Sequence, residues 1–268
     1  MTIDTLPALL DKMWDDYTRM NPQARRIYEQ FCERGESVQN DHIALRTFNH
    51  PKVTIDVLAK PFVDSGYVYR QDYQFPAKRL YAKHYEHPDA RYPKIFISEL
   101  KLEEFDEELQ KTVHALIDQV PDGQPESFDF CSQGRPWEVS YDTYEQLRAK
   151  SEYAAWMAAH GYRPNHFTVL VNALNSLADI REVNKFIKEA GFAMNDSGGE
   201  VKGSPEVYLE QSSTLADTVA VDFSDGQQQV PACYYEFAQR YPMPDGTLYQ
   251  GFVATSADKI FESTDKGQ

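Results

Sequence analysis

The chain has 268 residues, and its 42 Asp and Glu against 27 Lys and Arg give a formal net charge of −15. This length allows one large domain, or two closely packed halves, around a substantial apolar core. The acidic average repels a phosphate backbone, so we expect no nucleic-acid partner. No apolar run approaches the length of a membrane span and the first residues lack a signal-peptide pattern, so we expect no membrane association and a cytoplasmic protein.

The cysteines agree with a reducing compartment. Cys32, Cys131 and Cys233 are widely spaced and form no CxxC pair. The sequence therefore predicts neither a disulfide framework nor a thiolate zinc site.

In chain order, helical periodicity over residues 5–35, interrupted at Asn21-Pro22, predicts an N-terminal helical preface of residues 1–38. A first βαβββ module is expected over 39–120. It comprises a strand at 41–48, a helix at 53–64, strands at 67–70, 79–85 and 94–100, and a final helix at 102–119.

Residues 121–163 read as a connector, with a helical stretch at 141–160. A second βαβββ module with a C-terminal tail is expected over 164–268. Its elements are a strand at 165–172, a helix at 178–190, and strands at 192–195, 206–211, 218–223 and 232–238. We therefore predict an α+β fold, one compact unit in which two modules join curved sheets around one pocket.

Two stretches look like copies of one element, a polar residue followed by a histidine and a β-rich run. They are Asp41-His42-Ile43-Ala44-Leu45-Arg46-Thr47-Phe48 and Asn165-His166-Phe167-Thr168-Val169-Leu170-Val171-Asn172. Residues two apart in a strand share a face, so His42, Ala44 and Arg46 are expected to face the pocket. Both histidines could then face a common cavity of a duplicated fold.

Glu236, in the closing strand of the second module, completes a candidate site with His42 and His166. A lone histidine or glutamate in a strand is more often structural, but two histidines at corresponding places together with a glutamate favour a metal site. Imidazole and carboxylate ligands suit Fe(II), Mn, Zn or Ni, and three protein ligands leave positions open for substrate and dioxygen.

Arg46 lies about 13 Å along an extended strand from His42, on the same face. An arginine at the far end of a metal pocket is suited to binding a carboxylate through two hydrogen bonds. Glu99 is expected at the first-module place that corresponds to Glu236, where it could be a further ligand. A shift of one residue would turn Ser98 inward instead, so Glu99 stays outside the predicted site.

These residues resemble the 2-oxoadipate dioxygenase/decarboxylase (2-hydroxyglutarate synthase) family, which is related in fold to the glyoxalase or vicinal-oxygen-chelate proteins. The resemblance covers residues 40–264. Besides the two histidine stretches, it includes Gly199-Glu200-Val201-Lys202-Gly203-Ser204-Pro205-Glu206, Gln211-Ser212-Ser213-Thr214, Glu236-Phe237, Gly251-Phe252 and Ala257-Asp258-Lys259-Ile260-Phe261-Glu262-Ser263-Thr264.

The resemblance implies that His42, His166 and Glu236 bind Fe(II) and that Arg46 binds a substrate carboxylate. It also implies a reaction in which a 2-oxo acid and O2 give a hydroxy acid and CO2, turning 2-oxoadipate into 2-hydroxyglutarate, with a place in lysine catabolism. Characterised members are longer, so this chain looks like a compact version without inserted segments. Candidates for lining the pocket are Lys78, Arg79, Lys83 and Gln211-Ser212-Ser213.

Two other classes stay open. On the same scaffold, a glyoxalase-like isomerase or a metal hydrolase would use Zn, Ni or Mn to polarise a carbonyl or to activate water. A non-catalytic protein would bind a small molecule, and would keep that binding after His166→Ala. The sequence leaves the oligomeric state open, a homodimer included.

Overall fold

The computed structural model describes residues 3–253, and its centre is one eight-stranded sheet in the order β2-β3-β4-β1-β5-β10-β7-β6. Its first half comprises β1 (Asn40–Phe48), α3 (Ile55–Asp64), β2 (Val68–Phe75), β3 (Leu80–Glu86) and β4 (Lys94–Leu100). Its second half comprises β5 (Pro164–Leu170), α7 (Ile180–Glu189), β6 (Lys202–Ser204), β7 (Leu209–Ser213) and β10 (Tyr234–Arg240). The predicted α+β fold with two βαβββ modules is confirmed.

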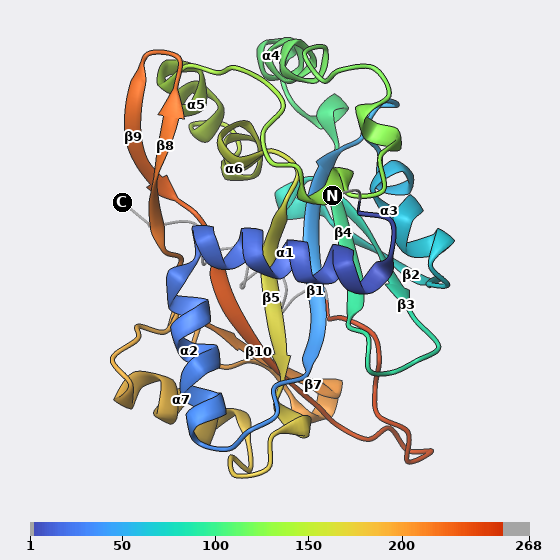
Figure 1. Ribbon diagram of the computed structural model, residues 1–268, viewed down its shortest axis with the longest axis vertical. Coiled ribbons are helices and arrows are strands. Elements are labelled where there is room, and N and C mark those ends of the chain that lie inside the picture. Colours follow the sequence, from blue (N-terminus) through green and yellow to red (C-terminus); the bar gives the residue numbers. More distant parts are fainter. Residues whose placement is uncertain (1–2, 254–268) are drawn as a thin grey trace.

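The two halves meet at β1 and β5, which pair antiparallel. In each half the first strand pairs in parallel with the last one, β1 with β4 and β5 with β10. The strand order therefore reads the same outward from the centre in both directions. This arrangement sets β1, β5 and β10 side by side (Figure 1).

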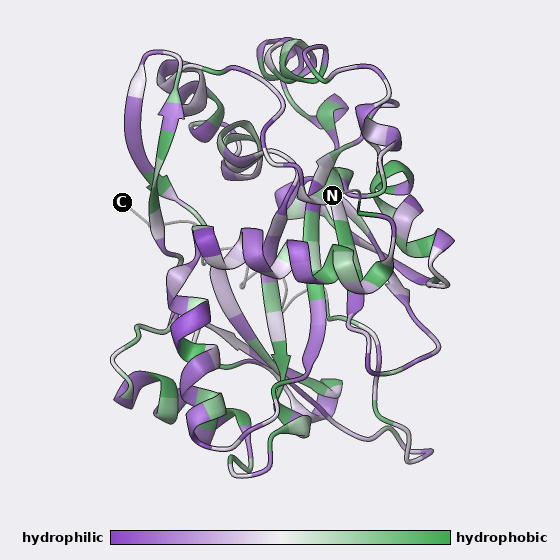
Figure 2. Ribbon diagram, viewed as in Figure 1, coloured by the Kyte–Doolittle hydropathy of each residue, from purple (hydrophilic) through white to green (hydrophobic). Residues whose placement is uncertain are grey.

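The N-terminal helices α1 (Leu6–Met20) and α2 (Pro22–Glu33) confirm the helical pattern of residues 5–35. Helix α1 lies across the central strands (Figure 1), and its Tyr17 ring packs 4.9 Å from that of Phe167. The Tyr17 hydroxyl donates a hydrogen bond of 2.6 Å to the carbonyl of Tyr234. Hydrophobic residues run along parts of β1, β4 and β5, whereas α1 and α2 carry both kinds of residue (Figure 2). The apolar side of this helix pair thus covers one face of the sheet.

The connector contains two helices where one helical stretch was expected. Helix α5 (Tyr141–Arg148) ends before α6 (Glu152–His160) begins. The Ser151 hydroxyl accepts a hydrogen bond of 3.1 Å from the amide of Ala154 and caps a new helix. Upstream, the predicted helix at 102–119 is a 3₁₀ turn (Leu102–Glu104) followed by α4 (Glu107–Ile117).

The second module departs from prediction at several places. Strand β6 lies outside every predicted strand, and the strand expected at 206–211 begins only at Leu209, after a 3₁₀ turn at Pro205–Val207. Residues 192–195 form no strand, only an isolated bridge from Met194 to Thr214. The strand at 218–223 exists as β8 (Thr218–Phe223), but it pairs with β9 (Gly226–Pro231) in a separate hairpin beside α5 (Figure 1). The turn of this hairpin is held there because the Asp225 carboxylate accepts a 2.7 Å hydrogen bond from the amide of Tyr141.

Two remaining expectations concern the membrane and the tail. Within residues 3–253, every helix is too short or too polar to cross a bilayer. The tail motif at 257–264 lies outside the described residues.

Candidate metal centre

His42 on β1, His166 on β5 and Glu236 on β10 come together on three adjacent strands. Their candidate ligand atoms all lie within 4.8 Å of one another. The Glu236 carboxylate is 3.6 Å from Nε2 of His42 and 3.3 Å from Nε2 of His166. All three side chains are buried. Over residues 3–253 this is the one group of three or more His, Cys, Asp or Glu side chains with metal-binding spacing, and we call it the triad.

Each histidine is preceded by an irregularity in the pairing of β1 with β5. The register passes from Asn40 to His42 without a partner for Asp41, and from Leu45–Pro164 to Ala44–His166 without one for Asn165. A bulge of this kind can re-aim a side chain. In both places the extra residue binds the histidine that follows it.

Asp41 Oδ1 lies 2.8 Å from Nδ1 of His42, and Asn165 Oδ1 lies 2.9 Å from Nδ1 of His166. With Nδ1 donating to these oxygens, Nε2 of each neutral ring keeps its lone pair. Burial lowers the pKa of both histidines, well below the usual value for His166, where the charges of His42 and Arg46 add to the effect. The sequence showed the two polar residues, but their role became visible only through the bulges.

The Glu236 carboxylate accepts a hydrogen bond of 2.6 Å from Nε2 of Gln211. Burial raises the pKa of Glu236 to about 8 despite this bond, so the carboxyl carries a proton at neutral pH when no cation is present. Of the pocket-lining candidates on β7, Gln211 therefore contacts the triad. Ser212 instead faces α7, where its hydroxyl donates a 2.6 Å hydrogen bond to Asn184.

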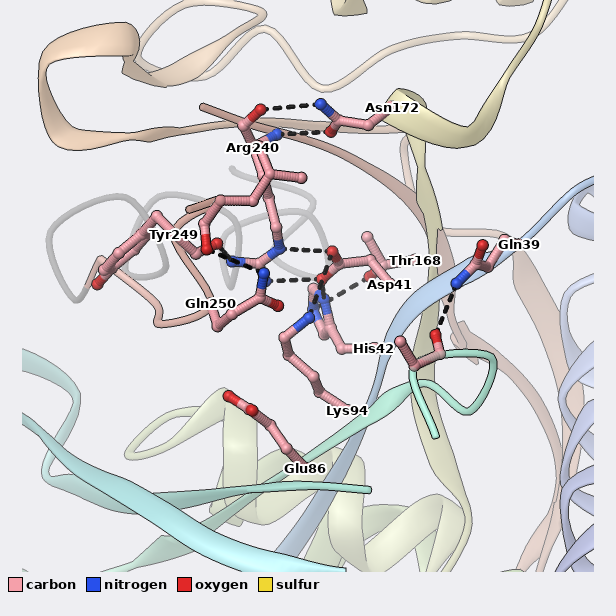
Figure 3. A network of polar contacts seen from close by, with 12 residues as sticks. Gln39, Asp41, His42, Glu86, Lys94, Thr168, Asn172, Arg240, Tyr249 and Gln250 are labelled. Atoms are coloured by element: carbon pink, nitrogen blue, oxygen red, sulfur yellow. Dashed lines mark hydrogen bonds and ion pairs between the residues drawn. The ribbon is translucent and has the colours of Figure 1, made fainter. Parts of the chain in front are cut away.

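Asp41 forms a buried ion pair with Arg240, which also lies on β10 (Figure 3). Nε of Arg240 lies 2.6 Å from Oδ2 and Nη2 lies 2.8 Å from Oδ1. Although burial opposes it, the charges of Arg240 and Lys94 hold the pKa of Asp41 well below its usual value. Asp41 is therefore a carboxylate at neutral pH and presents a negative charge to His42.

Arg46 is buried on the same strand as His42. Its guanidinium lies 4.8 Å from the centre of the Tyr153 ring and 5.0 Å from that of Trp156, and its Nη1 is 3.5 Å from Glu152. It lines a cavity of about 710 Å³. Its charge contributes to lowering the pKa of His166, and it belongs to the cavity lining, which includes none of the triad residues.

The other residues of the cavity are largely polar and charged. Besides Arg46 it is lined by Ala77, Lys78, Arg79, Leu80, Phe105, Glu145, Arg148, Ala149, Lys150, Ser151, Glu152 and Tyr153. Lys78 and Arg79, two of the candidates for lining the pocket, lie in this cavity. Lys83 does not line it, because its ammonium pairs at 2.7 Å with Asp56 on α3.

Glu99 lies on the opposite face of the sheet from the triad. Its carboxylate accepts a hydrogen bond of 3.2 Å from the amide of Ile55, at the start of α3. Ser98 turns inward instead, and its hydroxyl is 3.1 Å from that of Tyr153. The strand register explains why. Glu236 pairs with Thr168, whose counterpart in β1 is Ala44, and Ala44 pairs with Phe96. The expectation that Glu99 corresponds to Glu236 is therefore wrong by three residues.

A family model described as 2-oxoadipate dioxygenase/decarboxylase matches residues 3–249. The chain belongs to the 2-oxoadipate dioxygenase/decarboxylase family. It is 34% identical to the chloroplastic 2-oxoadipate dioxygenase/decarboxylase of Arabidopsis thaliana, over 96% of this chain and 76% of that protein. The family and its named members are enzymes, and the resemblance inferred from sequence is confirmed.

Solved structures agree with this assignment. The hydroxyglutarate synthase of Oryza sativa, in complex with 2-oxoadipate, matches with a TM-score of 0.90 at 33% identity, over 99% of this chain and 96% of that one. The curated relatives are longer than this chain, as expected, because the matches span 76% of the Arabidopsis thaliana protein and 79% of the Oryza sativa protein. A protein from Shewanella frigidimarina, described provisionally as a hydrolase, matches with a TM-score of 0.91 at 54% identity, over 95% and 100%.

A more distant match bears on the fold alone. A protein of Ralstonia eutropha assigned to the glyoxalase superfamily has a TM-score of 0.77 at 22% identity, over 91% of this chain and 84% of that one. This supports the glyoxalase-like fold class expected from the sequence.

Proposed function

We propose that this family member is an Fe(II)-dependent enzyme that uses O2 to convert a 2-oxo dicarboxylic acid to CO2 and the hydroxy acid shorter by one carbon. With 2-oxoadipate the product is 2-hydroxyglutarate, and both oxygen atoms enter the products. The observation that carries this proposal is the buried triad, in which two Nε2 atoms and a carboxylate face one point. The 2-oxoadipate complex of the Oryza sativa relative supports the choice of substrate.

The donor set fits a metal ion. Ligands held at about 2.1 Å and at right angles around one ion lie about 3 Å apart. The 3.3 Å and 3.6 Å separations of the triad are close to this spacing. His42, His166 and Glu236 would hold the ion. When bound, Fe(II) supplies open positions for the 2-oxo acid and for dioxygen, and the electrons that dioxygen chemistry needs. Zn, Ni or Mn would fit the same ligands.

The remaining residues bind substrate and exclude water. Arg46 would bind the distal carboxylate, since its guanidinium packs on the Tyr153 and Trp156 rings, lines the cavity and lies on the same strand as His42. Tyr234 stacks on the His166 ring with centroids 4.7 Å apart. Phe252 packs edge-on against His42 at 4.8 Å. These two rings keep water from the imidazoles, which favours chemistry between bound reactants.

The test is an anaerobic reconstitution. The purified protein is loaded with Fe(II), 2-oxoadipate is added, oxygen is admitted, and oxygen uptake and 2-hydroxyglutarate are measured together. We expect one molecule of 2-hydroxyglutarate to form for each molecule of O2 consumed. An absence of turnover with 2-oxoadipate and related 2-oxo acids at full iron occupancy would reject the oxygenase.

A metal hydrolase is the second candidate, because the relative at 54% identity carries that provisional description. It predicts turnover without oxygen and with Zn, Ni or Mn in place of iron. A glyoxalase-like isomerase makes the same prediction. A non-catalytic binding protein predicts that His166→Ala leaves 2-oxoadipate binding intact. The cytoplasmic location, the homodimer and the place in lysine catabolism stay predictions.

A further inference from the structure

Arg240 connects two parts of the molecule that are separate in the sequence. Its Nε and Nη2 bind the carboxylate of Asp41, and its Nη1 donates hydrogen bonds of 2.9 Å to the carbonyls of both Tyr249 and Gly251. All three guanidinium nitrogens are therefore used. The backbone of Arg240 is fixed as well, because the Asn172 side chain binds its amide at 2.8 Å and its carbonyl at 2.9 Å (Figure 3).

The segment of residues 249–252, which we call the covering segment, lies against a ligand of the triad. The Phe252 ring contacts His42 at 4.8 Å and Phe96 at 4.9 Å, and the Arg240 guanidinium lies 5.4 Å from its centre. The Phe252 amide donates a 3.1 Å hydrogen bond to the Tyr73 hydroxyl. The covering segment thus packs directly against His42.

The two histidines differ in what lies behind them. Both receive a side-chain oxygen at Nδ1 from the bulged residue before them. Behind His166 that residue is the neutral Asn165. Behind His42 it is Asp41, held by a cation that also binds the covering segment. The first half of the duplicated site therefore holds its histidine through an ion pair, which the second half lacks.

We propose that Arg240 is a positioning residue that fixes Asp41, His42 and the covering segment as one unit. This inference rests on the proposed function in one respect, that His42 binds a metal. A partner of a metal-binding histidine sets its ring orientation and its basicity, and loss of such a partner weakens metal binding by about 10–100-fold. Because Arg240 binds the covering segment with the same guanidinium, loss of the ion pair should also loosen residues 249–252.

The experiment compares Arg240→Lys and Asp41→Asn with the wild-type protein. Lysine keeps the charge but carries three N–H donors on one nitrogen, so it cannot replace the four hydrogen bonds that the guanidinium makes to Asp41 and the two carbonyls. Asparagine can still accept from His42, as Asn165 does for His166. The measurements are the affinity for Co(II) alone, the visible spectrum of the bound Co(II), and amide hydrogen exchange at residues 249–252. The control is Arg181→Lys, because Arg181 on α7 forms a two-point pair with Glu210 at 3.1 and 2.9 Å, and neither residue belongs to the triad.

In both test variants we expect Co(II) affinity to fall by about 10–100-fold, the spectrum to change, and exchange at residues 249–252 to rise, with no such changes in Arg181→Lys. A lowered unfolding temperature with wild-type Co(II) affinity, spectrum and exchange would show an ion pair that is merely structural, and would overturn the proposal. If one variant fails to fold, the other decides. If the wild-type protein binds no Co(II), the proposed metal site is wrong. In that case, unchanged amide exchange at residues 249–252 in Asp41→Asn would separately reject the proposal that the Asp41–Arg240 ion pair holds the covering segment.

Discussion

Phe96 occupies in the first module the position that Glu236 occupies in the second. The pairings Ala44–Phe96 and Thr168–Glu236 stand at the same place relative to His42 and His166. The fold repeats, but at this position one copy carries an apolar ring and the other a carboxylate. The triad is therefore asymmetric, with one ligand from the first half and two from the second.

Glu236→Gln should remove metal binding without weakening the metal-free fold. With a pKa of about 8, Glu236 is protonated at pH 7, and glutamine closely matches a protonated glutamate. Since the unfolded wild-type chain releases at pH 7 a proton that the folded chain keeps, a cost that glutamine removes, we expect the metal-free variant to be more stable than the wild-type protein, by on the order of 3 kcal/mol. Metal affinity should fall by more than about 100-fold. Thermal unfolding with and without Co(II) measures both, and a variant that Co(II) still stabilises would contradict a ligand role.

Arg46→Gln should impair substrate use far more than metal binding. The guanidinium lines the cavity but lies outside the triad. Loss of a two-point carboxylate contact should lower kcat/KM for 2-oxoadipate by about 100-fold, as expected for a charged hydrogen-bonded pair. Steady-state kinetics and Co(II) titration give the two numbers. An equal loss of both would mean that Arg46 is structural.

Arg79→Gln should reduce the rate of substrate capture. Arg79 lines the cavity with its guanidinium 4.4 Å from the centre of the Phe105 ring. A dianionic substrate is attracted by such a cation, so we expect kcat/KM to fall by about 3–10-fold at low salt. The difference should shrink as salt is added. Lys185→Gln is the control, because it makes an equal charge change at an exposed side chain of α7. The same loss of kcat/KM in that variant would mean that the effect of Arg79 is not local.

Glu99→Ala should destabilise the protein and leave the metal site intact. The carboxylate binds the first amide of α3, and loss of a helix cap costs about 1 kcal/mol. We expect a lower free energy of unfolding in denaturant titrations, together with unchanged Co(II) affinity. Weaker Co(II) binding would mean that Glu99 contributes to the metal site.

Acid should unfold the protein partly through His160. Burial lowers the pKa of His160 to about 3, and its Nε2 lies 2.8 Å from the carbonyl of Pro231. As pH falls below about 6.5, the unfolded chain takes up a proton that the folded chain does not. Stability is then lost down to about pH 3, by on the order of 1.4 kcal/mol per pH unit. In His160→Gln, unfolding from pH 7 to 4 should depend less on pH; an unchanged dependence would contradict this.

Local sequence was enough to predict the repeated modules and the three residues of the triad. Alternation with a period of two places His42 and Arg46 on one face, and the match of residues 41–48 with 165–172 reveals the duplication, because both are properties of consecutive residues. The N-terminal helix pair followed from periodicity in the same way.

Tertiary structure decided what depends on register and on distant partners. Sequence spacing predicted that Glu99 corresponds to Glu236 in the other module, but the pairing of the strands shows that Phe96 holds the corresponding position. The bulges at Asp41 and Asn165 and the ion pair from Asp41 to Arg240 follow from how β1, β5 and β10 align. Strand register and contacts between residues about 200 positions apart come from packing of the whole sheet, which no local pattern encodes. The sequence alone therefore determined the triad and the repeat, whereas the fold determined what holds His42 in place.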